Sequence, residues 1–169
     1  MKFFDPEEYQ PRARTVYLEI ARKLGILIPN AVIEHVGSSA IKEVVSKGDL
    51  DVFVGVDRTE ISRAIMAIEG LGFRIKRDTL RTHELHPFES KDYPFEVGIQ
   101  LVALGSRFEF FTRFRDILNS SAVLRERYNN LKLNAERLDG ESYRQVKSAF
   151  IETILKENGS VMVARKDIG

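Results

Sequence analysis

Residues 49–57, Asp-Leu-Asp-Val-Phe-Val-Gly-Val-Asp, constrain the fold of this chain more than any other stretch. A short run rich in valine is typical of a buried β-strand. Because side chains alternate along a strand, Asp49 and Asp51 lie on one face, and Leu50 and Val52 lie on the other. Two like charges on one face of a buried strand are unfavourable unless they are paired or hold a cation. This stretch therefore predicts a central strand with a polar site at its first residues.

The two carboxylates favour a metal-dependent reaction. Residues two apart on a strand are separated by roughly 7 Å, so both side chains can converge on a hard cation such as Mg²⁺ or Mn²⁺. Such a cation keeps positions open for substrate phosphates, which suits an in-line phosphoryl or nucleotidyl transfer. The alternative is that Asp49 only begins the strand in a solvated turn after Gly48, which leaves Asp51 alone inside the sheet.

A turn of Gly37, Ser38 and Ser39 precedes this strand. Gly37 lets the backbone approach a ligand closely, and the serine hydroxyls and the free amides of a new helical turn can donate to a triphosphate. The same residues are also ordinary helix caps, with or without a ligand. Lys47 can neutralise a phosphate or simply be solvated. We therefore treat Gly37, Ser38, Ser39 and Lys47 as candidate phosphate-binding residues.

Apolar periodicity and turn residues divide the rest of the chain into a mixed order of helices and strands. We expect a single domain of residues 1–158, helical from about residue 107, followed by a frayed tail of residues 159–169. The last two predicted strands form an antiparallel hairpin. Thr59 is the predicted cap of the helix at residues 60–72. The predicted helices are residues 6–24, 39–47, 60–72, 107–119, 121–138 and 142–158, and the predicted strands are residues 31–37, 49–57, 73–77, 81–88 and 95–104.

The composition limits the classes of function. The 169 residues contain 26 Lys and Arg against 25 Asp and Glu, so bulk charge does not indicate a nucleic-acid partner, and any such surface must be local. Cysteine is absent, which excludes disulfides, zinc knuckles and thiol chemistry. The first residues lack a secretory signal, and no run reaches the roughly 20 apolar residues that span a bilayer. We expect a cytoplasmic protein without a membrane partner.

The spacing of the two motifs resembles a known signature. A hydrophobic residue, Gly-Ser, ten further residues and then Asp-hydrophobic-Asp-hydrophobic is similar to the signature of the nucleotidyltransferase superfold to which DNA polymerase β belongs. This resemblance implies that the Gly-Ser turn holds the nucleotide phosphates and that Asp49 and Asp51 bind magnesium. It also implies a third acidic residue on a neighbouring strand.

Longer segments resemble the GrpB family, small proteins with the nucleotidyltransferase fold followed by helices. The resemblance runs from about Val32 to Leu155 and includes the C-terminal helices. It implies the fold and a nucleotidyltransferase-like pocket, but it does not imply a particular reaction. Its motifs are Glu-His-Val-Gly-Ser-Ser-Ala-Ile at residues 34–41, Ser-Lys-Gly-Asp-Leu-Asp-Val-Phe-Val at residues 46–54 and Val-Gly-Ile-Gln-Leu-Val-Ala-Leu-Gly-Ser at residues 97–106.

The chain departs from many GrpB relatives at two places. Many relatives carry Pro-Gly after the Gly-Ser turn, where this chain has Lys42-Glu43, so we expect a reshaped and more charged pocket edge. Many also carry a His-Leu-His strand before the helical part. The corresponding strand here is either the stretch from Gly98 to Gln100 or the stretch from His83 to His86.

The position of the third acidic residue stays open between two candidates. Glu96 is the first, because alternation along the strand at residues 95–104 puts it on the same face as Gln100. Glu84 is the second. We therefore treat Glu96 as a candidate catalytic residue, and Glu84 and Gln100 as candidate substrate contacts.

Two groups of side chains at the start of the helical part have simpler interpretations. Four phenylalanines at helical spacing are more typical of a helix core than of a base-stacking platform. Four arginines predict a solvated helical face. The phenylalanines are Phe108, Phe110, Phe111 and Phe114, and the arginines are Arg113, Arg115, Arg125 and Arg127.

The sequence as a whole predicts an α/β (α+β) fold, with a nucleotidyltransferase-like, mixed and mostly antiparallel sheet, flanking helices and a C-terminal helical segment. The expected function is Mg²⁺- or Mn²⁺-dependent transfer of a nucleotide monophosphate from a nucleoside triphosphate to an acceptor that the sequence does not identify. One alternative is a non-catalytic nucleotide-binding module. Another is a protein-interaction unit that uses the helical C-terminal half.

Overall fold

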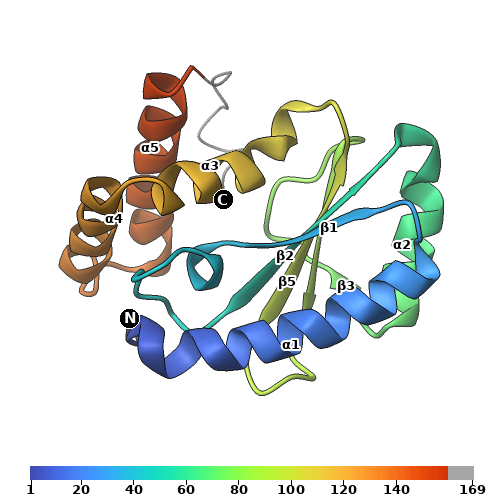
Figure 1. The fold of residues 1–169 in the computed structure, drawn as a ribbon, viewed down its shortest axis with the longest axis horizontal. Helices are drawn as coiled ribbons and strands as arrows, with labels where there is room; N and C mark the ends of the chain where they lie inside the picture. The colour runs from blue at the N-terminus through green and yellow to red at the C-terminus, as the bar shows by residue number, and fades with distance from the viewer. Residues whose placement is uncertain (160–169) are drawn as a thin grey trace.

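The computed structural model describes residues 1–159 and contains one five-stranded sheet, with the strand order β1-β2-β5-β4-β3 (Figure 1). Strands β2 and β5 are parallel, and every other pair of neighbours is antiparallel. The prediction of a mixed, mostly antiparallel sheet with a β4–β5 hairpin is therefore confirmed. The strands are β1 (Val32–Val36), β2 (Leu50–Val56), β3 (Arg74–Ile75), β4 (Leu85–Ser90) and β5 (Val97–Ala103).

Two helices, α1 (Pro6–Leu27) and α2 (Ile61–Gly70), cover one face of the sheet (Figure 1). The side chains of Leu50, Val52 and Val54 point into this layer and are completely buried. They alternate along β2 with the residues of the opposite face, as the strand pattern predicts. The helices contribute Ala13, Ile20, Leu24, Ile61, Ala64 and Ile68 to the same core.

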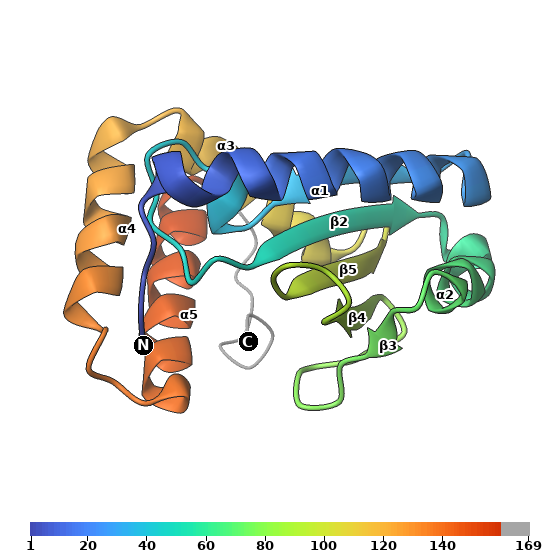
Figure 2. The ribbon, with the colours of Figure 1, turned by 90° about the horizontal axis from the view of Figure 1, so that it is seen from below.

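Three further helices, α3 (Phe110–Asn119), α4 (Ala122–Asn134) and α5 (Gly140–Glu157), form the second layer. Helices α4 and α5 lie side by side at one end of the sheet (Figure 2). Phe53 of β2 and Phe114 of α3 belong to the apolar core between this layer and the sheet. The rings of Phe114 and Tyr128 form a T-shaped pair whose centroids lie 5.5 Å apart. Phe108 and Phe110 are buried there too, and Phe111 is partly buried and packs against them, so the phenylalanines form core, as predicted.

The predicted helix at residues 39–47 is wrong. A 3₁₀ turn at Ser38–Ala40 is followed by an irregular loop as far as Gly48. Ile41 and Val44 are buried, as the apolar pattern requires, but α4 holds the loop: the backbone N–H of Val45 donates to Asn129 Oδ1 at 2.9 Å. Such tertiary contacts outweigh a weak local preference for helix.

Polar side chains shift several predicted boundaries. Asp57 caps the turn before α2 by accepting from the N–H of Thr59 at 2.9 Å, so Asp57 takes the capping role predicted for Thr59. Strand β4 begins only at Leu85, because the Thr82 hydroxyl accepts from the N–H groups of residues 84 and 85 and forms a turn. Asp139 accepts from the N–H of Ser142 at 2.9 Å and starts α5 at Gly140.

The predicted tail, residues 159–169, lies outside the described residues except for Gly159. Within residues 1–159, none of the helices combines the length and the apolar character needed to span a bilayer.

Candidate functional site

Asp51 is the second residue of β2, and glycine lies on both sides of it. Val36 pairs with it on β1, immediately before Gly37, and Gly98 is its partner on β5. A Cβ on Gly98 would lie 3.0 Å from Asp51 Oδ1, and a Cβ on Gly37 would collide with the Oδ2 atom. The two missing side chains therefore leave the space that the Asp51 carboxylate occupies.

Asp49 lies just before β2 and is held by the preceding loop. The hydroxyl of Ser46 donates to Asp49 Oδ1 at 3.0 Å. Both aspartates are partly exposed. The alternative interpretation, in which Asp49 belongs to the turn before the strand, is thus partly correct. The carboxylate of Asp49 nevertheless lies close enough to Asp51 for the two charges to interact.

The side chains of the two serines in the Gly-Ser-Ser turn have different surroundings. Gly37 has φ 71° and ψ −171°, a backbone conformation that is essentially restricted to glycine. Ser38 lies on the same side as Asp51, and its hydroxyl accepts from the ammonium of Lys132. Ser39 is directed elsewhere, since its hydroxyl shares a hydrogen bond of 2.7 Å with Nε2 of His35. Only Gly37 and Ser38 of the predicted turn line the pocket beside Asp51.

This pocket has a volume of about 80 Å³ and lies between the sheet and the C-terminal helices. Its walls combine a carboxylate, a hydroxyl, an amide and an ammonium group with aromatic rings. The lining residues are Gly37, Ser38, Asp51 and Gln100 from the sheet side, and Phe110, Phe111, Phe114, Tyr128, Lys147 and Ile151 from helices α3, α4 and α5.

Of the candidates on the neighbouring strands, the pocket contains Gln100 but neither glutamate. Gln100 pairs with Phe53 and therefore shares the face of Asp51. Glu96 lies just before β5 and outside this pocket, and its half-exposed carboxylate accepts from Lys76 at 3.3 Å. Glu84 pairs with Arg58 at the far end of β5. On β5, Gly98 thus lies opposite Asp51, and the side chain that this strand contributes to the pocket is an amide.

Two lysines that the sequence analysis missed lie at the site. Lys132 of α4 is only 1% exposed, and its Nζ donates to Ser38 Oγ and, at 2.6 Å, to the carbonyl of Val45. Lys147 of α5 lines the pocket together with Asp51. Each lysine follows a buried tyrosine of its own helix by four residues, which places it on the inward face. A lysine on the inward, otherwise apolar face of each helix was the sequence signal that could have identified these two residues.

Lys47, which the sequence analysis proposed for phosphate binding, is exposed beside the same cluster. Its ammonium lies 5.3 Å from the centre of the Tyr143 ring, and it lowers the pKa of Asp49. Lys47 is therefore placed at the edge of the site rather than in the pocket.

The environment shifts the pKa values of the two carboxyl groups in opposite directions. Burial disfavours ionisation of Asp49, but Lys147, Lys47 and the Ser46 hydroxyl outweigh burial and lower its pKa. Burial and the adjacent charge of Asp49 raise the pKa of Asp51 to about 6. Asp51 therefore takes up a proton at a higher pH than an isolated aspartate does, which is the behaviour of two acids that share a site.

The two buried amines also differ. Burial and then the charge of Lys147 lower the pKa of Lys132 well below its ordinary value. Burial also disfavours the charged form of Lys147. Tyr128, Tyr143 and the two aspartates outweigh the effect of burial and raise the pKa of Lys147. Lys147 is consequently the amine of the pocket whose charged form its surroundings favour.

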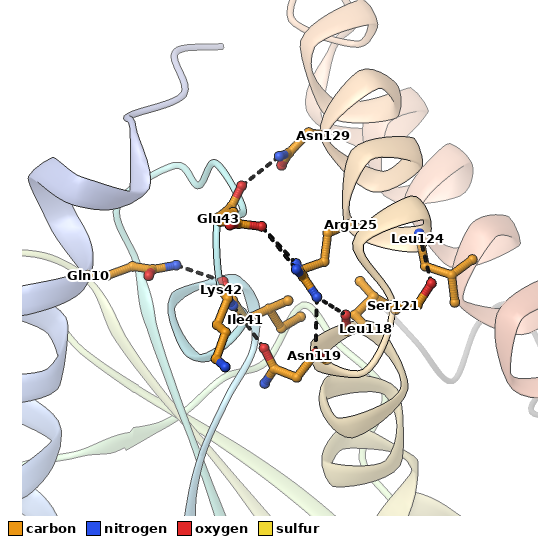
Figure 3. Close-up of polar contacts among 10 residues, drawn as sticks. All are labelled: Gln10, Ile41, Lys42, Glu43, Leu118, Asn119, Ser121, Leu124, Arg125 and Asn129. Atoms are coloured by element: carbon orange, nitrogen blue, oxygen red, sulfur yellow. Dashed lines mark hydrogen bonds and ion pairs between the residues drawn. The ribbon is translucent and has the colours of Figure 1, made fainter.

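Helix α4 fixes the loop that leads from the Gly-Ser-Ser turn to the aspartates (Figure 3). Nδ2 of Asn129 donates to the carbonyl of Glu43 at 2.7 Å, and Arg125 pairs with the Glu43 carboxylate at 3.0 Å. Glu43 has φ 59° and is the only non-glycine residue of positive φ among residues 1–159. The Lys42-Glu43 segment thus keeps a backbone shape that suits glycine, and an ion pair holds the added charge.

The predicted solvated face of four arginines is half wrong. Arg113 and Arg127 are exposed. Arg125 is largely buried and donates to the carbonyls of Leu118 and Asn119, each at 3.0 Å (Figure 3). Arg115 donates to the carbonyl of His35 at 2.8 Å and pairs with Glu34. The two enclosed arginines therefore attach α3 and α4 to β1 and its loop.

The residues of this site provide only part of the ligands that a metal ion needs. The described residues contain no group of three or more His, Cys, Asp or Glu side chains that could hold a metal ion. Two carboxylates remain at one end of β2, and magnesium commonly uses one or two carboxylates together with substrate phosphates. The residues therefore fit a cation whose coordination a phosphate chain completes.

Comparisons with solved structures show where else this fold occurs. The crystal structure of GrpB from Enterococcus faecalis is similar to the chain with a TM-score of 0.75 at 20% identity, covering 92% of this chain and 96% of that one. The Cid1 poly(U) polymerase structure has a TM-score of 0.54 at 18% identity, over 77% of this chain but only 43% of the polymerase. The nucleotidyltransferase-like fold is thereby confirmed.

Comparisons of sequence identify the family. A UPF0157 protein of Vibrio cholerae is 44% identical over 155 residues, which are 92% of this chain and 82% of the relative. A UPF0157 protein of Deinococcus radiodurans is 28% identical over 137 residues, 79% of this chain and 71% of that protein. The family described as GrpB protein matches residues 6–157, and the chain therefore belongs to the GrpB family.

Proposed function

We propose that the pocket beside Asp51 binds a nucleoside triphosphate and that the protein transfers the nucleotide monophosphate to an acceptor. One observation carries this proposal: Asp51 lies between two glycine backbones, in a pocket that also holds Ser38 and Lys147. An acid pair for a divalent cation and a donor set for phosphates are thus combined in one place. We retain cytoplasmic location as a prediction.

The fold comparison supports the same class of ligand. Cid1 poly(U) polymerase is described with MgGTP bound and in complex with the UTP analog UMPNPP. The chain spans less than half of that polymerase, so the likeness supports a nucleotide pocket and does not extend to the polymerase reaction.

The residues of this chain would divide the work as follows. Asp49 and Asp51 would hold Mg²⁺ or Mn²⁺, which, when bound, neutralises phosphate charge and aligns the reacting groups. Ser38 and the ammonium group of Lys147 would hold the β- and γ-phosphates, and Lys132 would orient the Ser38 hydroxyl. Gln100 offers an amide beside Asp51 for orienting the substrate.

The bond changes are those of an in-line displacement. An acceptor hydroxyl oxygen bonds to the α-phosphorus, the bond from that phosphorus to the oxygen bridging to the β-phosphorus breaks, and pyrophosphate leaves. The hydroxyl proton passes to a base. Glu96 is our candidate for this role, because its backbone carbonyl accepts from the N–H of Leu50 at 3.0 Å, one residue after Asp49 in the chain.

A second candidate function is nucleotide binding without transfer. It is favoured by Gln100, because this amide is the side chain that β5 contributes to the pocket, and an amide cannot accept a proton at neutral pH. This function predicts nucleotide binding with no release of pyrophosphate. A protein-interaction unit built on α4 and α5 predicts neither.

The test measures thermal stabilisation by each nucleoside triphosphate, with and without Mg²⁺, and pyrophosphate release in the same samples. A ligand that binds only the folded state raises its apparent stability with the logarithm of ligand excess. We expect Mg²⁺-dependent stabilisation that Asp49→Asn/Asp51→Asn abolishes and that Asp92→Asn, an exposed control, retains. Stabilisation that the double substitution leaves unchanged would remove the site from consideration.

A further inference from the structure

The charges beside the two aspartates do not match those of a ready-made cation site. Lys147 shares the pocket with Asp51, Lys132 contacts the hydroxyl of Ser38, and Lys47 lies at the edge. Three amines thus accompany two carboxylates. A free divalent cation approaching the carboxylates would meet like charge, whereas a phosphate chain would meet opposite charge.

Lys147 is the lysine whose ammonium has no anchor. Lys132 donates to Ser38 Oγ and to the Val45 carbonyl, but Lys147 makes no hydrogen bond or ion pair with any residue in the range 1–159. An ammonium group enclosed between helices usually has such partners, because its desolvation is unfavourable. Lys147 therefore has donors available for an anion that enters the pocket.

The dimensions of the pocket indicate which part of an anionic ligand it takes. Its volume of about 80 Å³ lies far below the roughly 300–1,000 Å³ of pockets that enclose drug-sized ligands. Its polar groups are the carboxylate of Asp51, the hydroxyl of Ser38, the amide of Gln100 and the ammonium of Lys147. These groups match the charged end of a ligand better than a nucleobase.

We propose that Lys147 makes this site bind its divalent cation only together with a polyphosphate chain, because the ammonium repels the free cation and pairs with the phosphates. The inference rests on the proposed function, since it concerns the same pocket. Binding of the cation and of the phosphates is then coupled, and by linkage each ligand raises the affinity for the other by one and the same factor.

The test measures each ligand alone, so that chelation of one by the other in solution does not interfere. Titrations of the full chain use Mn²⁺, followed by electron paramagnetic resonance, and tripolyphosphate, followed by calorimetry. In Lys147→Met we expect Mn²⁺ to bind at least about tenfold more tightly and tripolyphosphate at least about tenfold more weakly than in the wild type, the lower range of typical coupling. Lys147→Arg, which keeps the charge, should resemble the wild type in both titrations.

Opposite shifts in the two affinities are the signature that a general structural defect cannot produce. Lys156→Met removes an exposed lysine from the same helix and should change neither affinity. The proposal is overturned if Lys147→Met weakens both ligands, or if the wild type binds Mn²⁺ as tightly as Lys147→Met does.

The outcome is separable from the fate of the proposed function. If nucleoside triphosphates neither stabilise the protein nor release pyrophosphate while the opposite shifts are seen, the nucleotide reaction fails and the coupled site stands. If nucleotides bind and react but Mn²⁺ affinity does not respond to Lys147→Met, the coupling fails and the reaction stands.

Discussion

The carboxylate of Asp51 lies in the space that a side chain on Gly37 would occupy. A Cβ at residue 37 would lie 3.0 Å from Asp51 Cβ and would collide with the carboxylate itself. The Gly-Ser-Ser turn, which we propose binds phosphate, and Asp51, the proposed metal ligand, therefore fit together because residue 37 has no side chain.

Gly37→Ala should displace Asp51 and strain the turn together. The positive φ at residue 37 alone costs a non-glycine residue about 1–3 kcal/mol. We expect a lower free energy of unfolding by urea and loss of the Mg²⁺-dependent stabilisation by nucleotides. Gly105→Ala is the matched control, since Gly105 also has a positive φ but has no atom within 4 Å of its built Cβ. Equal nucleotide binding by both variants would show that the fit to Asp51 is unimportant.

Asp51 and Asp49 should affect stability in opposite directions when no ligand is present. Burial and Asp49 raise the pKa of Asp51 to about 6, above its unfolded value, so its ionised form destabilises the fold above pH 6. The neighbouring cations lower the pKa of Asp49 despite its burial, so its ionised form stabilises the fold. We expect Asp51→Asn to raise the free energy of unfolding at pH 7.5 by about 1–2 kcal/mol, and Asp49→Asn to lower it.

The pH dependence provides the check on this pair. The advantage of Asp51→Asn should shrink as the pH falls from 7.5 to 5, because the wild type then gains stability by protonating Asp51. Urea denaturation at the two pH values measures the difference. A wild type that is more stable than Asp51→Asn at pH 7.5 would contradict the unfavourable placement of this carboxylate.

The sequence predicted the parts of the site that are close together in the chain. Gly37, Ser38, Asp49 and Asp51 fall within 15 residues, and strand alternation predicts that the two acids share a face. Of these four residues, Gly37, Ser38 and Asp51 line the pocket. The helix predicted at residues 39–47 is wrong. The buried residues Ile41, Val44 and Val45 do follow a helical spacing, but the loop forms hydrogen bonds with α4 instead of within a helix.

Long-range placements were beyond the same reasoning. Lys132 meets Ser38, and Lys147 enters the pocket of Asp51, only through the packing of α4 and α5 against the sheet. Alternation along β5 could not show that Gln100 rather than Glu96 enters the pocket. The alternation of side chains determines which face of its strand a residue lies on. The pairing of strands and the packing of helices determine which residues from other elements lie beside it.

His35 should make the stability of the fold sensitive to mild acid. Its ring stacks on Tyr17 at 4.9 Å, and burial together with the charges of Arg115 and Arg14 lowers its pKa to about 4. Because the unfolded pKa is about 6.5, the stabilisation is complete above pH 6.5 and is lost as the pH falls toward 4. We expect this residue to account for about 2–3 kcal/mol of the loss between pH 7.5 and 4.5.

The measurement compares the pH dependence of urea denaturation in the wild type and in His35→Gln. The substituted protein should lose less stability on acidification, whereas His83→Gln, at an exposed histidine, should follow the wild-type curve. Parallel curves for the wild type and His35→Gln would mean that His35 is not the residue that senses acid.

Glu43 combines an unfavourable backbone with an exposed ion pair, and two substitutions separate the effects. Its φ of 59° is strained for any residue except glycine, while its ion pair with Arg125 leaves the Glu43 side chain 74% exposed and is worth at most about 1 kcal/mol. Glu43→Ala and Glu43→Gly both remove the ion pair, and only Glu43→Gly relieves the backbone. We therefore expect Glu43→Gly to be about 1 kcal/mol more stable than Glu43→Ala in urea denaturation. Since Asn129 binds the backbone carbonyl of residue 43 rather than its side chain, both variants should retain the loop and the nucleotide-dependent stabilisation. An alanine variant as stable as the glycine variant would show that the loop relaxes to a negative φ, and that α4 does not impose its shape.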